Sequence, residues 1–224
     1  MMKTPMSVWA FLSLIGLGLF LPGCGKVTGP ISPLINPSIA SFGSFDDGTT
    51  DSWVYDSSSP VNLSSTWPLT VTSQAFQGPY ALEIPVPDLA YSVNAGVTTY
   101  ISLSGYSVHY QITSSGQGLN LFNMTLSMWV KLVSGVVTAP NQIGAQIFLK
   151  DSAYQYANGT FVKLVPGQWM QVTYNVNAPN YQASPAPNVS NVYQVGLQLA
   201  GNGSSLFTSP GVVDADSFGW EKTP

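Results

Sequence analysis

The stretch SFDDGTTDSW places three carboxylates, Asp46, Asp47 and Asp51, close together in the sequence. The whole chain of 224 residues contains only 10 acidic residues, so a cluster of like charges needs something that holds it together. Carboxylates grouped in this way could supply oxygen ligands to a hard cation. Asp, Gly and Thr also favour turns, because their short polar side chains bond to nearby backbone amides. An ordinary turn without a metal is therefore the alternative.

Catalytic groups are sparse elsewhere in the chain. Glycoside hydrolysis uses two carboxyl groups that face each other across a cleft, but Glu83 and Glu221 are the only glutamates, and the aspartates gather near residue 46 or in loops. The sole histidine, His109, has no serine or cysteine nucleophile pattern nearby, so neither a triad nor a His-rich catalytic metal site is indicated. The sequence predicts a protein that is not an enzyme.

Amide side chains recur on one side of several predicted strands, because successive strand residues point to opposite faces. Stretches 126–132, 145–150, 193–199 and 108–112 each place apolar residues on one face, for example Leu126, Met128, Val130 and Leu132. If these strands share a sheet, its other face carries hydrogen-bonding amides beside flat rings, the combination that a sugar requires. The predicted ligand-binding residues are Gln146, Lys150, Gln194 and Gln198, with His109 and Trp129 as neighbours and with Tyr154 and Tyr156 in the segment that follows residue 150. Merely solvated strand faces are the alternative, and Trp129 could instead fill a gap in the core.

The elements that position these residues are short and rich in β-branched and aromatic residues, with Gly, Pro, Asn and Ser clusters between them. No stretch shows a sustained helical period with caps at both ends. The expected fold is all-β, a jelly-roll β-sandwich of two antiparallel sheets.

The first 23 residues have the character of a signal peptide, with Lys3 followed by a short apolar run. The run ends in LPGC, which resembles the lipobox of bacterial lipoproteins, although Pro22 departs from the usual residue type. The expected organisation is a lipoprotein signal peptide at 1–23, lipidated Cys24 with a proline-containing tether at 24–40, and one domain at 41–224. The only cysteine would carry the diacylglycerol and the further acyl chain, of the palmitate type, and an ordinary secretory signal is the alternative. Gly25 in place of Asp indicates the outer membrane of the bacterial cell envelope.

Charge excludes one class of partner. All six basic residues are lysines, and the formal net charge is -4. A chain without arginine or a basic run lacks the electrostatic footprint of a nucleic-acid-binding protein. We therefore expect neutral ligands and no nucleic acid.

Three motifs resemble carbohydrate-binding modules of the galactose-binding-like jelly-roll type. They are Phe45-Asp46-Asp47-Gly48 with Trp53, then Gly78-Pro79-Tyr80-Ala81-Leu82, then Asp216-Ser217-Phe218. Such modules commonly carry a structural calcium ion where the first and last strands meet. The resemblance implies Ca²⁺ ligands at Asp46, Gly48, Gln77 and Asp216, with Asp51 left as a turn residue.

Two functions remain open from the sequence. One is a non-catalytic, lipid-anchored surface module that binds a polysaccharide or oligosaccharide on the concave face of the sandwich, with a separate glycan-degrading enzyme as a possible partner. The other is a structural or adhesive envelope lipoprotein that uses the same fold for protein contacts, since a fold does not fix a function.

Overall fold

The computed structural model describes residues 43–56, 67–86, 92–94, 97–99, 106–111, 118–135, 142–202 and 211–224. Cys24, the signal peptide and the tether lie outside these residues. No helix among the described residues is long and apolar enough to cross a membrane.

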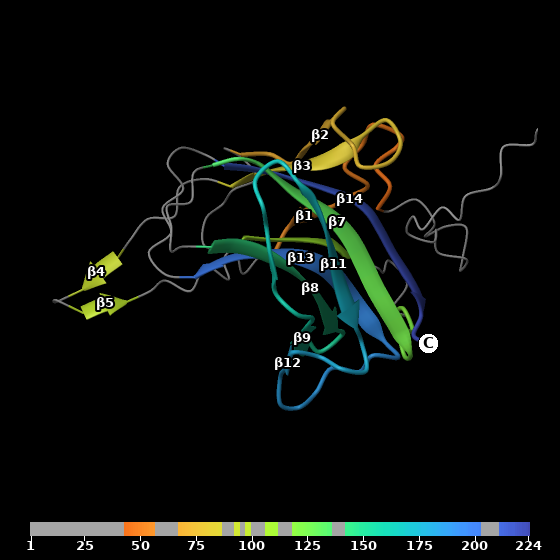
Figure 1. The fold of residues 1–224 in the computed structure, drawn as a ribbon. Coiled ribbons are helices and arrows are strands. Elements are labelled where there is room, and N and C mark those ends of the chain that lie inside the picture. Colours follow the sequence, from red (N-terminus) through yellow and green to blue (C-terminus); the bar gives the residue numbers. More distant parts are fainter. Residues whose placement is uncertain are drawn as a thin grey trace, which may run out of the picture.

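The described strands form two antiparallel sheets and a separate hairpin (Figure 1). Sheet A has seven strands in the order β1-β6-β13-β8-β9-β12, with β10 also paired to β8. Its strands are β1 (Val54–Tyr55), β6 (Tyr106–Gln111), β8 (Gln142–Asp151), β9 (Tyr156–Asn158), β10 (Val162–Lys163), β12 (Tyr181–Gln182) and β13 (Val192–Asn202). Sheet B has five strands in the order β11-β7-β14-β3-β2. Its strands are β2 (Thr70–Thr72), β3 (Ala81–Val86), β7 (Met124–Ser134), β11 (Trp169–Asn175) and β14 (Gly211–Lys222). The hairpin strands β4 (Ser92–Asn94) and β5 (Val97–Thr99) pair only with each other.

The core lies between the two sheets, which Figure 1 shows as two layers. Sheet B contributes alternate residues of β7 and sheet A contributes alternate residues of β8 and β13, as the period of two predicts. These inward residues are Leu126, Met128, Val130, Leu132, Ala145, Ile147, Leu149, Val195, Leu197 and Leu199, all of them buried. The predicted all-β jelly-roll sandwich of two antiparallel sheets is confirmed.

One expectation about strand placement is wrong. The strand that contains Trp129, β7, belongs to sheet B, where it pairs with β11 and β14, whereas the other three amide-bearing strands pair in sheet A. The sequence alternation also predicts that Tyr193 faces inward, but a register shift between Val192 and Gln194 interrupts the alternation. The Tyr193 ring lies outside the core, with its centre 6.2 Å from that of the Tyr154 ring. Alternation along one strand does not show which sheet the strand joins or where a bulge interrupts it.

The acidic cluster at residues 46–51 forms a hydrogen-bonded turn. Asp47 Oδ1 accepts the backbone N–H of Thr49 at 2.8 Å and its hydroxyl at 2.7 Å, and these bonds lower the pKa of Asp47. Asp51 Oδ2 accepts the backbone N–H of Phe45 at 3.1 Å, although burial raises the pKa of Asp51. The turn conformation therefore accounts for Asp47 and Asp51 without a metal.

Candidate functional site

The outer face of sheet A carries a group of polar side chains that we call the polar face: Gln146, Lys150, Tyr156, Asn158, Gln194 and Gln198. They lie at the strand positions between the inward residues of β8, β9 and β13. The strand register places Gln198 opposite Gln146 and Gln194 opposite Lys150. On the other side of β8, Lys150 lies opposite Tyr156. Five of the residues predicted as ligand-binding thus come together on one face: Gln146, Lys150, Tyr156, Gln194 and Gln198.

Two of these side chains donate hydrogen bonds to one oxygen of a third, Gln198 Oε1. Gln146 donates its amide N–H to Gln198 Oε1, and the Tyr156 hydroxyl donates to the same oxygen at 2.8 Å. Asn158 Nδ2 in turn donates to the Tyr156 hydroxyl at 3.0 Å. Burial, the largest cause, raises the pKa of Tyr156, so this hydroxyl remains protonated and a donor at neutral pH. The network fixes the orientation of each amide.

Lys150 forms an ion pair with a residue that the sequence did not single out. Its Nζ lies 2.7 Å from Oδ2 of Asp56, which directly follows β1. Asp56 is 3% exposed, and the side chain of Lys150 is 15% exposed. The ion pair crosses sheet A, because β6 and β13 lie between β1 and β8. The two residues are 94 positions apart in the chain, so no local pattern could have shown the contact.

Two amide oxygens of the polar face are buried without a hydrogen-bond partner in the described part of the chain, Asn158 Oδ1 and Gln194 Oε1. Their residues are 6% and 5% exposed. An unpaired buried acceptor costs about 1–3 kcal/mol, and a donor from outside would recover this cost only after the groups that cover the oxygen shift, because both atoms are closed to solvent. Both atoms accept hydrogen bonds only, so their natural partner is a hydroxyl or N–H group.

Aromatic rings adjoin the polar face. The ring of Phe148, which is buried, stacks with that of Tyr156 at 5.7 Å and 25°. Tyr181 on β12 lies 6.1 Å from Tyr156 and is 56% exposed. Tyr181 therefore provides an accessible ring at the edge of the face. The sequence reasoning missed it because β12 has only two residues and lies in a proline- and asparagine-rich stretch.

The other predicted neighbours are placed differently. His109 on β6 pairs in register with Gly196 on β13, a position in the same outward-facing row as Gln194 and Gln198. The side chain of His109 lies outside what the structure describes. Tyr154 is 60% exposed and its ring meets Tyr193. Trp129 does not adjoin the polar face, because β7 is in sheet B, and the prediction that placed it there is wrong.

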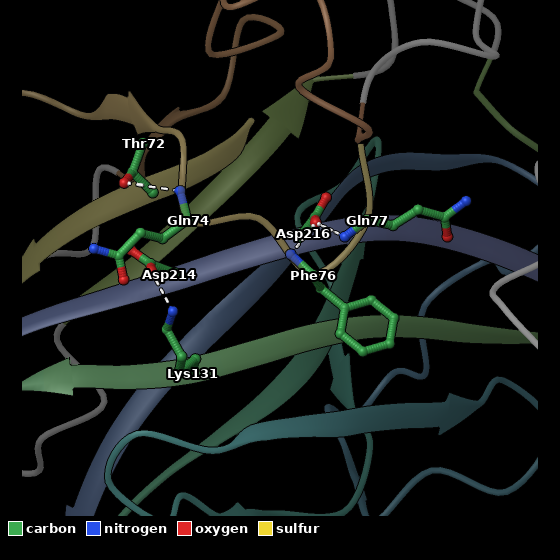
Figure 2. Close-up of polar contacts among 7 residues, drawn as sticks. All are labelled: Thr72, Gln74, Phe76, Gln77, Lys131, Asp214 and Asp216. Atoms are coloured by element: carbon green, nitrogen blue, oxygen red, sulfur yellow. Dashed lines mark hydrogen bonds and ion pairs between the residues drawn. The ribbon is translucent and has the colours of Figure 1, made fainter. Parts of the chain in front are cut away.

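Trp129 instead belongs to an aromatic cluster on the outer face of sheet B. Phe76, from the connection between β2 and β3, stacks on Trp129 with ring centres 3.9 Å apart and planes at 13°. Lys131 Nζ lies 4.7 Å from the centre of the Trp169 ring. The same Nζ lies 3.2 Å from Oδ2 of Asp214 (Figure 2). Burial, which outweighs the effect of Lys131, raises the pKa of Asp214 to about 6. Phe76 covers Trp129, so this tryptophan is not an open platform.

Asp216 anchors the segment that carries Phe76. Its Oδ2 accepts the backbone N–H groups of Phe76 at 2.8 Å and Gln77 at 2.9 Å (Figure 2). Its Oδ1 accepts the backbone N–H of Ser217 at 2.6 Å. Asp216 is fully buried, and this burial raises its pKa although the three N–H groups oppose the shift. A segment early in the chain is thereby fixed to the last strand.

The residues implied for calcium are partly gathered here. Asp46 Oδ1 lies 1.9 Å from the point that a Cβ on Gly78 would occupy, so Asp46 and Asp216 both reach the 76–78 segment. Gly48 has a φ of 76° and lies against the ring of Tyr80. Among the described residues no three acidic, histidine or cysteine side chains form a metal-binding group. Carboxylates such as those of Asp46 and Asp216 are the ligand type that Ca²⁺ prefers, and calcium here stays a prediction.

Comparison with known proteins gives similarity of fold only. No protein-family model matches the chain, and no curated protein matches it. A solved exo-β-agarase structure has a TM-score of 0.51 and 7% identity, over 81% of this chain and 24% of that one. This match shows that a solved protein contains the same fold.

Carbohydrate-binding modules occur among the other similar structures, at lower TM-scores. The CBM22-1 xylan-binding domain of Paenibacillus barcinonensis Xyn10C has a TM-score of 0.42 and 15% identity, over 81% of this chain and 92% of that one. A CBM28 module described as specific for non-crystalline cellulose has a TM-score of 0.43 and 15% identity, over 81% of this chain and 93% of that one.

Proposed function

We propose that this chain is a non-catalytic, lipid-anchored surface module that binds a polysaccharide or oligosaccharide through the polar face of sheet A. The observation that carries the proposal is the pair of buried amide oxygens without partners, Asn158 Oδ1 and Gln194 Oε1, beside a fixed amide network. A simple solvated strand face would not bury these groups. A ligand rich in hydroxyl donors would satisfy them.

The geometry supports two kinds of contact with a sugar, hydrogen bonds and packing against an aromatic ring. Hydroxyl groups would donate to the unpaired oxygens, while the exposed ring of Tyr181 offers a surface against which the C–H face of a sugar can pack. Each hydrogen bond contributes about 0.5–1.5 kcal/mol net, so several bonds with one ring contact give micromolar to millimolar affinity.

The anchor in this proposal is Cys24, with residues up to 40 as the tether, in the outer membrane of a bacterial envelope. Stable attachment needs more than one acyl chain, which lipoprotein modification of Cys24 would supply. A module held in this way would keep a glycan near the cell surface, where a separate glycan-degrading enzyme could act on it.

A glycan array probed with the full chain, purified in a detergent without a sugar head group, tests the proposal. The panel contains neutral β-glucans, mannans, xylans and agarose, and titration calorimetry follows on any that bind. We expect saturable binding of at least one glycan without formation of new reducing ends. If no glycan binds, the result would favour the structural or adhesive envelope lipoprotein.

A further inference from the structure

The ion pair between Lys150 and Asp56 determines the charge at the centre of the polar face. Apart from these two residues, the polar face as described carries only amides and the Tyr156 hydroxyl. The positive charge of Lys150 is already matched by a carboxylate at 2.7 Å, and the side chain of Asp56 is 1% exposed. Burial, the largest cause, and the charge of Asp56 both raise the pKa of Tyr156.

A second lysine lies at the far end of the same side of sheet A. Lys163 on β10 is exposed and pairs in register with Gly144, six positions along β8 from Lys150. At about 3.3 Å per residue this separation is roughly 20 Å. Water and salt screen an exposed charge at that distance, so Lys163 does not set the charge at the centre of the face.

An acidic sugar would meet unfavourable groups at this centre. A uronate carboxylate that approached Lys150 would also approach Asp56, and like charges in a buried site repel strongly. If it displaced Asp56 from Lys150, it would leave that carboxylate buried without its cation, which is a strongly unfavourable state. A neutral sugar avoids both penalties, because its hydroxyls can donate to the amide oxygens and leave the ion pair intact.

We propose that Asp56 is a specificity-determining residue of the polar face, and that its pairing with Lys150 excludes anionic glycans from the site. This inference rests on the function proposed above. It predicts that removal of the Asp56 charge, with Lys150 kept, creates affinity for acidic glycans that the natural chain lacks.

The test uses glycan pairs that share a backbone and differ in charge: a β-1,4-glucan with polyglucuronate, a mannan with polymannuronate, and a xylan with glucuronoxylan. Titration calorimetry is performed with the full chain in the same detergent. We expect the natural chain to bind one neutral member at least about 100-fold more tightly than its acidic partner, which is the order of the penalty for breaking a buried pair. Asp56→Asn should strengthen binding of the acidic partner at least about tenfold, and added salt should weaken this new binding.

Two variants serve as controls. Asp56→Asn with Lys150→Gln should lose the new affinity, because the released cation is gone, and Lys163→Gln should behave like the natural chain. If Asp56→Asn does not fold, the proposal is tested by the natural chain alone, through its ratio of affinities for the neutral and the acidic glycan of each pair. Two results would overturn the role of Asp56 and leave the proposed function standing. One is equal affinity of the natural chain for the neutral and the acidic glycan of a pair. The other is an Asp56→Asn variant that binds the neutral glycan but gains no affinity for the acidic one. Binding of no glycan at all would instead count against the proposed function.

Discussion

Replacing Asp216 by alanine should destabilise the fold more than any change in the acidic turn at residues 46–51. The Asp216 carboxylate accepts three backbone N–H groups at 2.6–2.9 Å, and two of them belong to a segment about 140 positions earlier in the chain. A hydrogen bond to a charged group contributes about 1.5–3 kcal/mol, and the alanine variant would also leave partly buried donors unpaired. Such effects are not additive, so we expect a loss of about 3–5 kcal/mol in the free energy of unfolding. For a domain of this size the melting temperature should fall by roughly 6–20 °C.

Differential scanning calorimetry measures the loss, and tryptophan fluorescence reports the local cause. Phe76 stacks on Trp129, so release of the 76–77 segment should expose the tryptophan ring to water. Asp47→Ala is the matched control, because the exposed Asp47 bonds only within its own turn, and it should shift the melting temperature much less. If Asp216→Ala and the natural chain have the same melting temperature, the argument that this carboxylate fixes the 76–77 segment to β14 is refuted.

Three further predictions concern the ion, the anchor and a buried carboxylate. If calcium binds at Asp46 and Asp216, chelator should lower the melting temperature and added calcium should restore it. At a hundredfold excess of calcium over the dissociation constant, the stabilisation is about 2.7 kcal/mol. Identical melting temperatures with chelator and with calcium would refute the calcium hypothesis. Cys24→Ser should release the protein from membranes or leave it unprocessed, and unchanged fractionation and processing would contradict the lipoprotein hypothesis. The folded-state pKa of Asp214 is about 6, above its unfolded value, so its ionisation lowers stability as pH rises from about 4 to 6. The difference in free energy of unfolding between Asp214→Asn and the natural chain, measured by denaturant titration, should therefore shift by about 1–3 kcal/mol in favour of the variant as pH rises from 4 to 7. Parallel curves of this free energy against pH would show that Asp214 does not titrate in this way.

Local patterns in the sequence were sufficient for the long strands β7, β8 and β13 and for most of their inward residues. The apolar alternation in β7, β8 and β13 identified buried residues such as Met128, Ile147 and Leu197, because a strand has a fixed period of two. The three glutamines of the polar face followed from the same rule, whereas Asn158, on the three-residue strand β9, was missed. Their register across β8 and β13 then placed Gln146 opposite Gln198.

Features set by contacts between distant segments could not be predicted in this way. Trp129 fits the alternation of β7 as expected, but the pairing of β7 with β14 puts it on the opposite sheet. The ion pair of Asp56 joins the end of β1 to β8 across two intervening strands. Such contacts depend on topology, which one strand's pattern does not specify.

The central claim is that the polar face of sheet A binds the glycan, and calorimetric titration of one double variant tests it most directly. Gln146→Ala with Gln198→Ala removes the two amides of the polar face that hydrogen-bond to each other. The control is Gln171→Ala, an exposed glutamine on β11 opposite Trp129 in sheet B. With the tightest-binding neutral glycan, we predict that the double variant binds at least about tenfold more weakly, which corresponds to about 1.4 kcal/mol, while the control binds like the natural chain. Full affinity in the double variant, or an equal loss in Gln171→Ala, would contradict the claim.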